Sequence, residues 1–188
     1  MKKVLFVLLT AVFMGVFGVG GYHLYLYYSE SAQSDEIYSG LTDYVQVPDP
    51  TKKPPHPTGE TDEDGEKMDS DIDWPEVDFQ ALREINPDIV GWLYCEDTVI
   101  NYPVVQGSDN SYYLRHLFDG AYNAIGCLFL DCRVNGDLSD AHSIIYGHHM
   151  KNGSMFSSLD GYKNQEYYEE HPQLLLVTPD ANYVVELF

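Results

Sequence analysis

The chain has 188 residues, 44% of them hydrophobic, and a formal net charge of −20. This length allows one domain of ordinary size with additional segments, and the hydrophobic content is enough for a packed core. The negative charge argues against nucleic acid as a partner, and an anionic membrane surface would repel the chain as a whole. Three cysteines are an odd number and do not describe a disulfide framework. We expect Cys95, Cys127 and Cys132 to be small buried side chains.

A long apolar segment follows Lys2 and Lys3, and residues 4–28 carry no formal charge. About 20 apolar residues suffice for a helix to cross a bilayer, and the tyrosines near residue 28 favour the interface. Lysines before the segment and acids after it place the N-terminus in the cytoplasm and the rest outside the cell. We therefore predict a single-pass membrane anchor over 1–28. A cleaved signal peptide is the alternative, although Ser29-Glu30-Ser31 is a poor small-x-small cleavage site.

Residues 29–73 contain a cluster of prolines and an acidic run over 60–66. Few of their side chains could form a core, so the composition predicts a disordered or extended tether. A folded domain over 74–188 follows. It would be held away from the membrane but within the cell envelope.

The pattern in 74–188 is typical of a mostly β fold, a barrel or sandwich decorated by short helices. Pro103 suggests that its strand lies at an edge or carries a bulge. Asp78 can cap the first helix. Helices are expected over 77–85, 111–117, 155–159 and 165–171, and strands over 89–95, 99–105, 126–131, 143–146, 174–177 and 183–188.

The stretch 143–150 organises this domain. Ser143 to Tyr146 reads as a short buried strand, and Gly147 removes the Cβ where the backbone must turn or approach another group closely. His148 follows directly. A histidine at the exit of a rigid strand can be held in one orientation and still reach solvent, which suits a proton donor or acceptor. The alternative is a turn histidine without a chemical role.

Residue 188 falls inside a strong strand pattern, with no turn or polar tail after it. A barrel left open there would expose unpaired strand edges. From this pattern we expect the polypeptide, and with it the barrel, to be incomplete at the C-terminus.

Five segments, in this order, carry a likeness to a known family: 85–93, 100–107, 109–114, 126–131 and 145–156. From about residue 77 onward the sequence resembles the class B sortases, membrane-anchored cysteine transpeptidases of Gram-positive bacteria. The N-terminal anchor and tether match the layout of that family. The resemblance implies the sortase β-barrel and no cofactor or metal.

The resemblance also implies a chemistry. Sortases use a Cys-His-Arg set: the cysteine attacks the Thr-x bond of a C-terminal sorting signal, and an amine of the cell-wall peptide resolves the thioester. His148 falls on the family's histidine, as general acid and base. Tyr146, Asn110 and Leu114 fall where class B members line the groove for the sorting signal. Core packing is the alternative for Tyr146 and Leu114, and a helix cap for Asn110.

One departure is large. The family's nucleophilic cysteine and arginine would both come after residue 188, and Cys127 and Cys132 precede the histidine, so neither takes the nucleophile's role. We expect the 188-residue chain to be inactive. A sortase known as a fragment and a non-catalytic, shortened envelope protein both remain open. A coding sequence continuing with a Thr-x-Thr-Cys-like segment would favour the first, and a stop codon the second.

Two other functions have less support in the sequence. A metal site of His142, His148 and His149 lacks zinc-ligand spacing, and the adjacent pair would point apart on an extended backbone. A serine or cysteine hydrolase complete within the chain would need a nucleophile signature such as a nucleophile elbow, and we find none.

Overall fold

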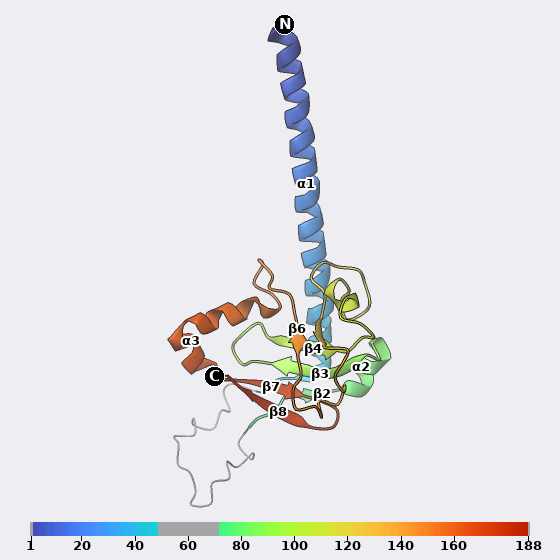
Figure 1. Ribbon diagram of the computed structural model, residues 1–188, viewed down its shortest axis with the longest axis vertical. Helices are drawn as coiled ribbons and strands as arrows, with labels where there is room; N and C mark the ends of the chain where they lie inside the picture. The colour runs from blue at the N-terminus through green and yellow to red at the C-terminus, as the bar shows by residue number, and fades with distance from the viewer. Residues whose placement is uncertain (1, 49–71, 188) are drawn as a thin grey trace, which may run out of the picture.

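The computed structural model describes residues 2–48 and 72–187. A long helix projects from a body built on a curled sheet, and the N-terminus lies at the far tip of that helix (Figure 1). The helices are α1 (Lys2–Leu41), α2 (Phe79–Ile85) and α3 (Gln165–Glu170), with 3-10 helices η1 (Thr42–Tyr44), η4 (Tyr112–Leu114) and η5 (Phe156–Lys163). The strands are β1 (Val45–Gln46), β2 (Glu76–Val77), β3 (Ile89–Tyr94), β4 (Asn101–Val105), β5 (Leu128–Leu130), β6 (Ile145–Tyr146), β7 (Gln173–Val177) and β8 (Asn182–Glu186).

Six strands form the main sheet in the order β6-β5-β4-β3-β7-β8, and β1 pairs with β2 separately. Only β4 and β5 run parallel, so the sheet is mixed. It curls into a half-barrel, with short helices at its margins (Figure 1). The mostly β, barrel-like architecture predicted from the sequence is confirmed. The largest fully buried side chains are Trp92, Phe118, Phe129, Leu82 and Ile100.

Local differences from the predicted elements have simple causes. β4 lies between β3 and β5, so the edge position predicted from Pro103 is wrong. Pairing of β4 with β5 begins at Val104, one residue after Pro103, so a proline is tolerated at position 103. The bulge lies in β3 instead, between Ile89 and Gly91. The segments predicted as helices over 111–117 and 155–159 are 3-10 helices instead. The Asp78 cap is confirmed, because its carboxylate accepts a 3.0 Å hydrogen bond from the Ala81 N–H.

Helix α1 differs most from expectation. It continues without a break to Leu41, so the reading of residues 29–41 as extended or disordered is wrong. The last turns of α1 bury Ser34, Tyr38 and Leu41 in the body. The Tyr38 hydroxyl donates a 2.6 Å hydrogen bond to the Gly126 carbonyl oxygen, and burial raises the pKa of Tyr38. Tertiary packing therefore holds a helix whose sequence there is mostly polar.

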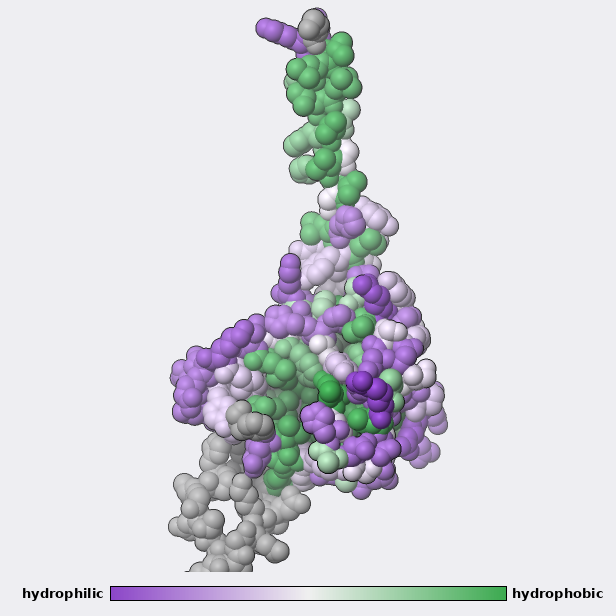
Figure 2. Space-filling view, in the orientation of Figure 1, coloured by the Kyte–Doolittle hydropathy of each residue, from purple (hydrophilic) through white to green (hydrophobic). Residues whose placement is uncertain are grey.

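The first part of α1 packs against no other element within residues 2–48 and 72–187. Its large apolar side chains from Val4 to Val19 are 59–72% exposed, and Figure 2 shows this part of the helix as a mostly green column, with some paler patches, above the body. The helix is long and apolar enough to cross a membrane. Residues 49–71 of the predicted tether lie outside the described residues, and the division into 1–28, 29–73 and 74–188 stays a prediction.

A Tyr38→Phe substitution tests whether α1 is part of the folded body. It leaves the buried Gly126 carbonyl without its donor, which lowers the free energy of unfolding by about 1–3 kcal/mol. Urea unfolding in detergent, followed by tryptophan fluorescence, measures this change. Tyr28→Phe is the matched control, because Tyr28 is 64% exposed and its loss of a hydroxyl changes stability by less than about 0.5 kcal/mol. Equal stability of the two variants would contradict the packing of α1.

Candidate active site

Strand β6 leads into the site from the edge of the sheet. It has two residues, Ile145 and Tyr146, which pair with Leu130 and Phe129 of β5. The sequence predicted a longer and buried strand over 143–146. Both residues are only half-buried, because β6 has a neighbouring strand on one side alone. The Tyr146 ring stacks on Phe129, with the ring centres 5.1 Å apart.

Gly147 lies where the backbone passes between two side chains. A Cβ at this position would be 2.4 Å from Leu128 Cδ2 and 2.6 Å from a ring carbon of Phe156. Neither distance is possible for a real carbon contact, so any side chain here would displace its neighbours. The close approach predicted for this glycine is therefore confirmed.

His148 follows at the exit of β6. Its Nε2 lies 2.8 Å from the Leu114 carbonyl oxygen. A carbonyl oxygen only accepts, so Nε2 carries the hydrogen and Nδ1 is the basic nitrogen of the neutral ring. The His148 carbonyl oxygen accepts a 3.0 Å hydrogen bond from the Phe156 N–H. The residue is half-buried, so its ring is oriented and also within reach of solvent.

A buried carboxylate lies beneath Tyr146. The side chain of Asp131 is 2% exposed and accepts a 3.0 Å hydrogen bond from the Tyr146 hydroxyl. Arg133 donates to both carboxylate oxygens from its side chain, at 2.9 and 2.5 Å, and adds its backbone N–H at 2.9 Å. The Arg133 contacts hold the pKa of Asp131 well below its usual range, and Asp131 in turn raises the pKa of Tyr146.

Asn110 and Leu114 approach this region from the η4 segment. The Asn110 side-chain oxygen accepts a 2.8 Å hydrogen bond from the Cys132 N–H, one residue beyond Asp131. Asn110 does not cap η4, and it is the Oδ1 of Asp109 that accepts from the Ser111 and Tyr112 N–H groups. The structure thus places Leu114 next to His148. It places Asn110 and Tyr146 near Asp131, which directly follows β5.

Asp131 and Arg133 did not emerge from the sequence reasoning. The available signal was an aspartate directly after the apolar run Leu128–Leu130, followed by an arginine two residues later. That pattern is compatible with an ordinary loop. Tyr146 bonds to Asp131 from 15 positions away, and Asn110 bonds to the Cys132 N–H from 22 positions away, so only the fold reveals the cluster.

The three cysteines lie elsewhere. Cys95 and Cys127 are each 2% exposed, as predicted, and burial raises the pKa of both thiols, that of Cys127 to about 12. Cys132 is half-buried, which corrects the expectation for that residue. Among the described residues, none of the three thiols is hydrogen-bonded to His148. A thiol that resists ionisation is a poor nucleophile.

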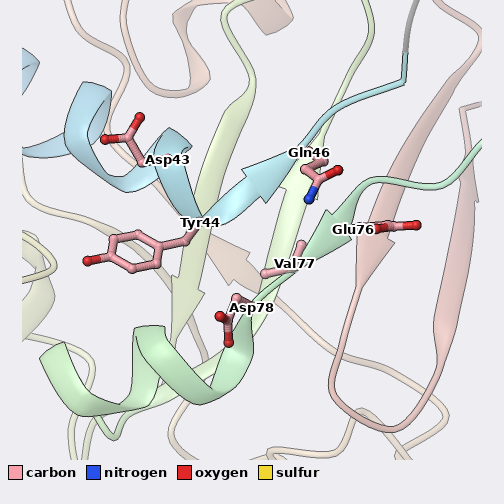
Figure 3. Close-up of a pocket in the computed structure, with 6 residues that line it drawn as sticks. All are labelled: Asp43, Tyr44, Gln46, Glu76, Val77 and Asp78. Carbon is pink, nitrogen blue, oxygen red and sulfur yellow. The ribbon is translucent and has the colours of Figure 1, made fainter.

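A separate pocket of about 320 Å³ opens between β1, β2 and the start of α2 (Figure 3). Its lining residues are Asp43, Tyr44, Gln46, Glu76, Val77 and Asp78. Figure 3 shows its three carboxylates on different sides of the pocket, and that of Asp78 already caps α2. None of the predicted site residues lines this pocket. Within residues 2–48 and 72–187, no group of three or more His, Cys, Asp or Glu is placed to hold a metal ion.

Comparison with known proteins identifies the fold. Over 180 residues the chain is 32% identical to sortase B of Listeria monocytogenes, covering 96% of this chain and 66% of the relative. It is 36% identical over 110 residues to sortase B of Staphylococcus aureus, covering 58% and 45%. The chain thus spans just under two thirds of the Listeria monocytogenes relative and less than half of the Staphylococcus aureus relative. No family model matches it.

Solved structures agree. Sortase B of Bacillus anthracis in complex with AAEK1 matches with a TM-score of 0.66 at 28% identity, over 86% of this chain and 68% of that one. A Staphylococcus aureus sortase B–substrate complex matches with a TM-score of 0.57 at 35% identity, over 58% and 51%. The likeness covers 96% of this chain, and the chain belongs to the class B sortase family.

The Asp131 cluster generates a pH-dependent prediction. Because the pKa of Asp131 is depressed in the folded chain, its stabilisation is present above the ordinary aspartate pKa of about 4 and is lost as the pH falls through the lower folded value. Asp131→Asn therefore lowers Tm by several degrees at pH 7, and the difference from the unsubstituted protein shrinks as the pH falls below 4.

Asp137→Asn is the control for this experiment. Asp137 also has a lowered pKa, through hydrogen bonds from Ser139, but it is an exposed loop residue without an ion pair in the described chain. Its substitution changes Tm much less. Equal losses in the two variants at pH 7 would show that the Asp131 cluster does not stabilise the site.

Proposed function

We propose that the chain is the membrane-anchored portion of a sortase-type cysteine transpeptidase that contains the peptide groove and the acid–base histidine. The observation that carries this proposal is the placement of His148. Its Nε2–H is fixed on the Leu114 carbonyl while its ring remains accessible, in a fold shared with sortase B structures. A histidine held and yet reachable can pass a proton between substrate atoms.

The reaction requires a thiolate as the nucleophile and an imidazole as the general acid and base. A thiolate adds to the carbonyl carbon of the Thr-x bond, the C–N bond breaks, and His148 supplies the proton that the departing amine needs. The incoming amine of the cell-wall peptide then loses a proton to His148, attacks the thioester carbon and displaces the sulfur. Asn110, Leu114 and Tyr146 line the groove that holds the sorting signal. Asp131 orients Tyr146 by accepting the hydrogen bond from its hydroxyl.

Cys95 and Cys127 do not suit the nucleophile's role, because they are buried thiols with raised pKa values, and Cys132 makes no hydrogen bond to His148 among the described residues. We therefore propose that the 188-residue polypeptide binds sorting-signal peptides and does not turn them over. The same observation favours a second candidate, a non-catalytic sortase-like protein of the envelope. The two differ in whether a catalytic cysteine is supplied to His148.

Helix α1 supports the proposed location. It is a candidate span with Lys2 and Lys3 before its apolar part and acids after it, so we place the N-terminus in the cytoplasm and the body outside the cell. The acceptor would be an amine of peptidoglycan. A sortase B–substrate complex is known for the Staphylococcus aureus relative, which supports a peptide groove in this part of the fold.

Peptide binding and turnover, measured together, test the proposal. Purified 188-residue protein is titrated with fluorescent peptides that contain a Thr-x bond. We expect binding, weakened about tenfold by Tyr146→Ala or Leu114→Ala, which remove side-chain contacts in the groove. Tyr183→Ala is the control, because Tyr183 is a tyrosine on β8, at the opposite edge of the sheet from β6. Equal affinity in all variants would show that the peptide binds outside the proposed groove.

No cleavage is expected from the same protein with an amine acceptor present. Steady turnover lost on Cys127→Ala or Cys132→Ala would overturn the assignment of roles. In any form of the enzyme that carries the nucleophile, His148→Ala lowers kcat by at least about a hundredfold, as expected for loss of a general acid–base. His149→Ala is the control, since its ring is paired with Asp160 at 2.7 Å on the surface, and it retains activity.

A further inference from the structure

Helix α1 is continuous from the candidate span into the body. Its uncharged stretch ends at Tyr28, and its first hydrogen bond with the body is made by Glu30, only two residues later. Two helical residues correspond to about 3 Å along the axis. There is no flexible segment between the candidate span and the body. The position of the body relative to a membrane is therefore determined by the helix.

Two loops of the body hold α1 at this point. Asn123, fully buried, donates to the Glu30 carbonyl at 2.8 Å and to the Gln33 side chain at 3.1 Å. Asn152 donates to the Ser31 hydroxyl at 3.1 Å. Figure 1 shows both loops, one yellow and one orange, beside α1 at the end of the body from which the helix emerges. These loops must face whatever surface the apolar part of α1 enters.

Apart from the exposed acid Asp119, the larger exposed side chains on these loops have the chemistry of the lipid interface. Tyr122, next to Asn123, is 62% exposed, and its ring packs edge-on against His116 at 5.6 Å. Arg115 and Lys151 are exposed and make no ion pair within the described residues. Arg133 and Lys163, by contrast, are paired with aspartates. Tyrosine and basic side chains are favoured at phospholipid headgroups.

We propose that the loops 115–123 and 150–154 form a docking face that rests on the phospholipid headgroups around α1. The inference rests on the proposed membrane anchor and deepens it. The helix sets the height and the orientation of the body, and Tyr122 and Lys151 contact the bilayer surface. The strongly acidic remainder of the chain favours the same orientation, because it is repelled by anionic lipid. His148 lies four residues before Asn152, which bonds to Ser31 of α1 at the proposed docking face. The candidate site therefore lies beside the membrane.

Depth-sensitive fluorescence of the full chain tests this proposal. In a Cys132→Ser background, Tyr122→Cys, Lys151→Cys and Asp180→Cys are each labelled with an environment-sensitive dye; Cys95 and Cys127 are buried and unreactive. The proteins are reconstituted into phosphatidylcholine vesicles that contain headgroup-spin-labelled lipid. Quenching should be several-fold stronger at positions 122 and 151 than at 180, an exposed residue of the β7–β8 turn, away from the exit of α1 in Figure 1.

A second variant tests the role of the continuous helix. A flexible Gly/Ser linker inserted between Ser29 and Glu30 uncouples the body from the span. Quenching at position 122 should then fall to the level at 180, while the protein still floats with the vesicles. Equal quenching at all three positions, or no effect of the linker, would overturn the docking face. Failure of the unsubstituted chain to float with vesicles would instead overturn the membrane anchor.

Discussion

The close packing of the Gly147 backbone against Leu128 and Phe156 is the constraint on which the site depends. With a hydrogen in place of a side chain, β6 can pass into the turn between these two apolar groups. The next residue then lies against the Leu114 carbonyl. Phe156 contributes twice, because its N–H also bonds to the His148 carbonyl oxygen. Apolar packing therefore determines the position of a polar, proton-carrying ring.

A second layer of the site is ionic. Asp131 directly follows the buried strand β5 and accepts hydrogen bonds from Arg133 and Tyr146, while the Cys132 N–H donates to Asn110. A buried carboxylate without partners would be costly, so this cluster ties the η4 segment, β5 and β6 to one geometry. Two of the proposed groove residues, Asn110 and Tyr146, owe their positions to it. The chemistry of the groove thus depends on a residue that need not contact the peptide.

Much of the fold could be predicted from the sequence where the signal is local. The apolar runs that became β3, β5 and β7 and the Asp78 cap are visible in the order of residues, and so are Gly147 and His148. The continuation of α1 could not be predicted, because residues 29–41 are largely polar and are helical through contacts such as that of Tyr38 with Gly126. The Asp131 cluster was missed for the same reason, since its partners are distant in the chain. The order of strands, with β3 between β4 and β7, also depends on long-range pairing.

The central claim is that His148 is held through Nε2–H on the Leu114 carbonyl, with Nδ1 left as the basic nitrogen. Nitrogen-15 NMR of the imidazole, recorded at alkaline pH where histidines are neutral, tests it directly. The account predicts that His148 is almost wholly the Nε2–H tautomer, with a ring proton protected from exchange by the Leu114 hydrogen bond. A ring protonated at Nδ1, or a freely exchanging mixture of tautomers like that of a solvent-exposed histidine, would contradict it.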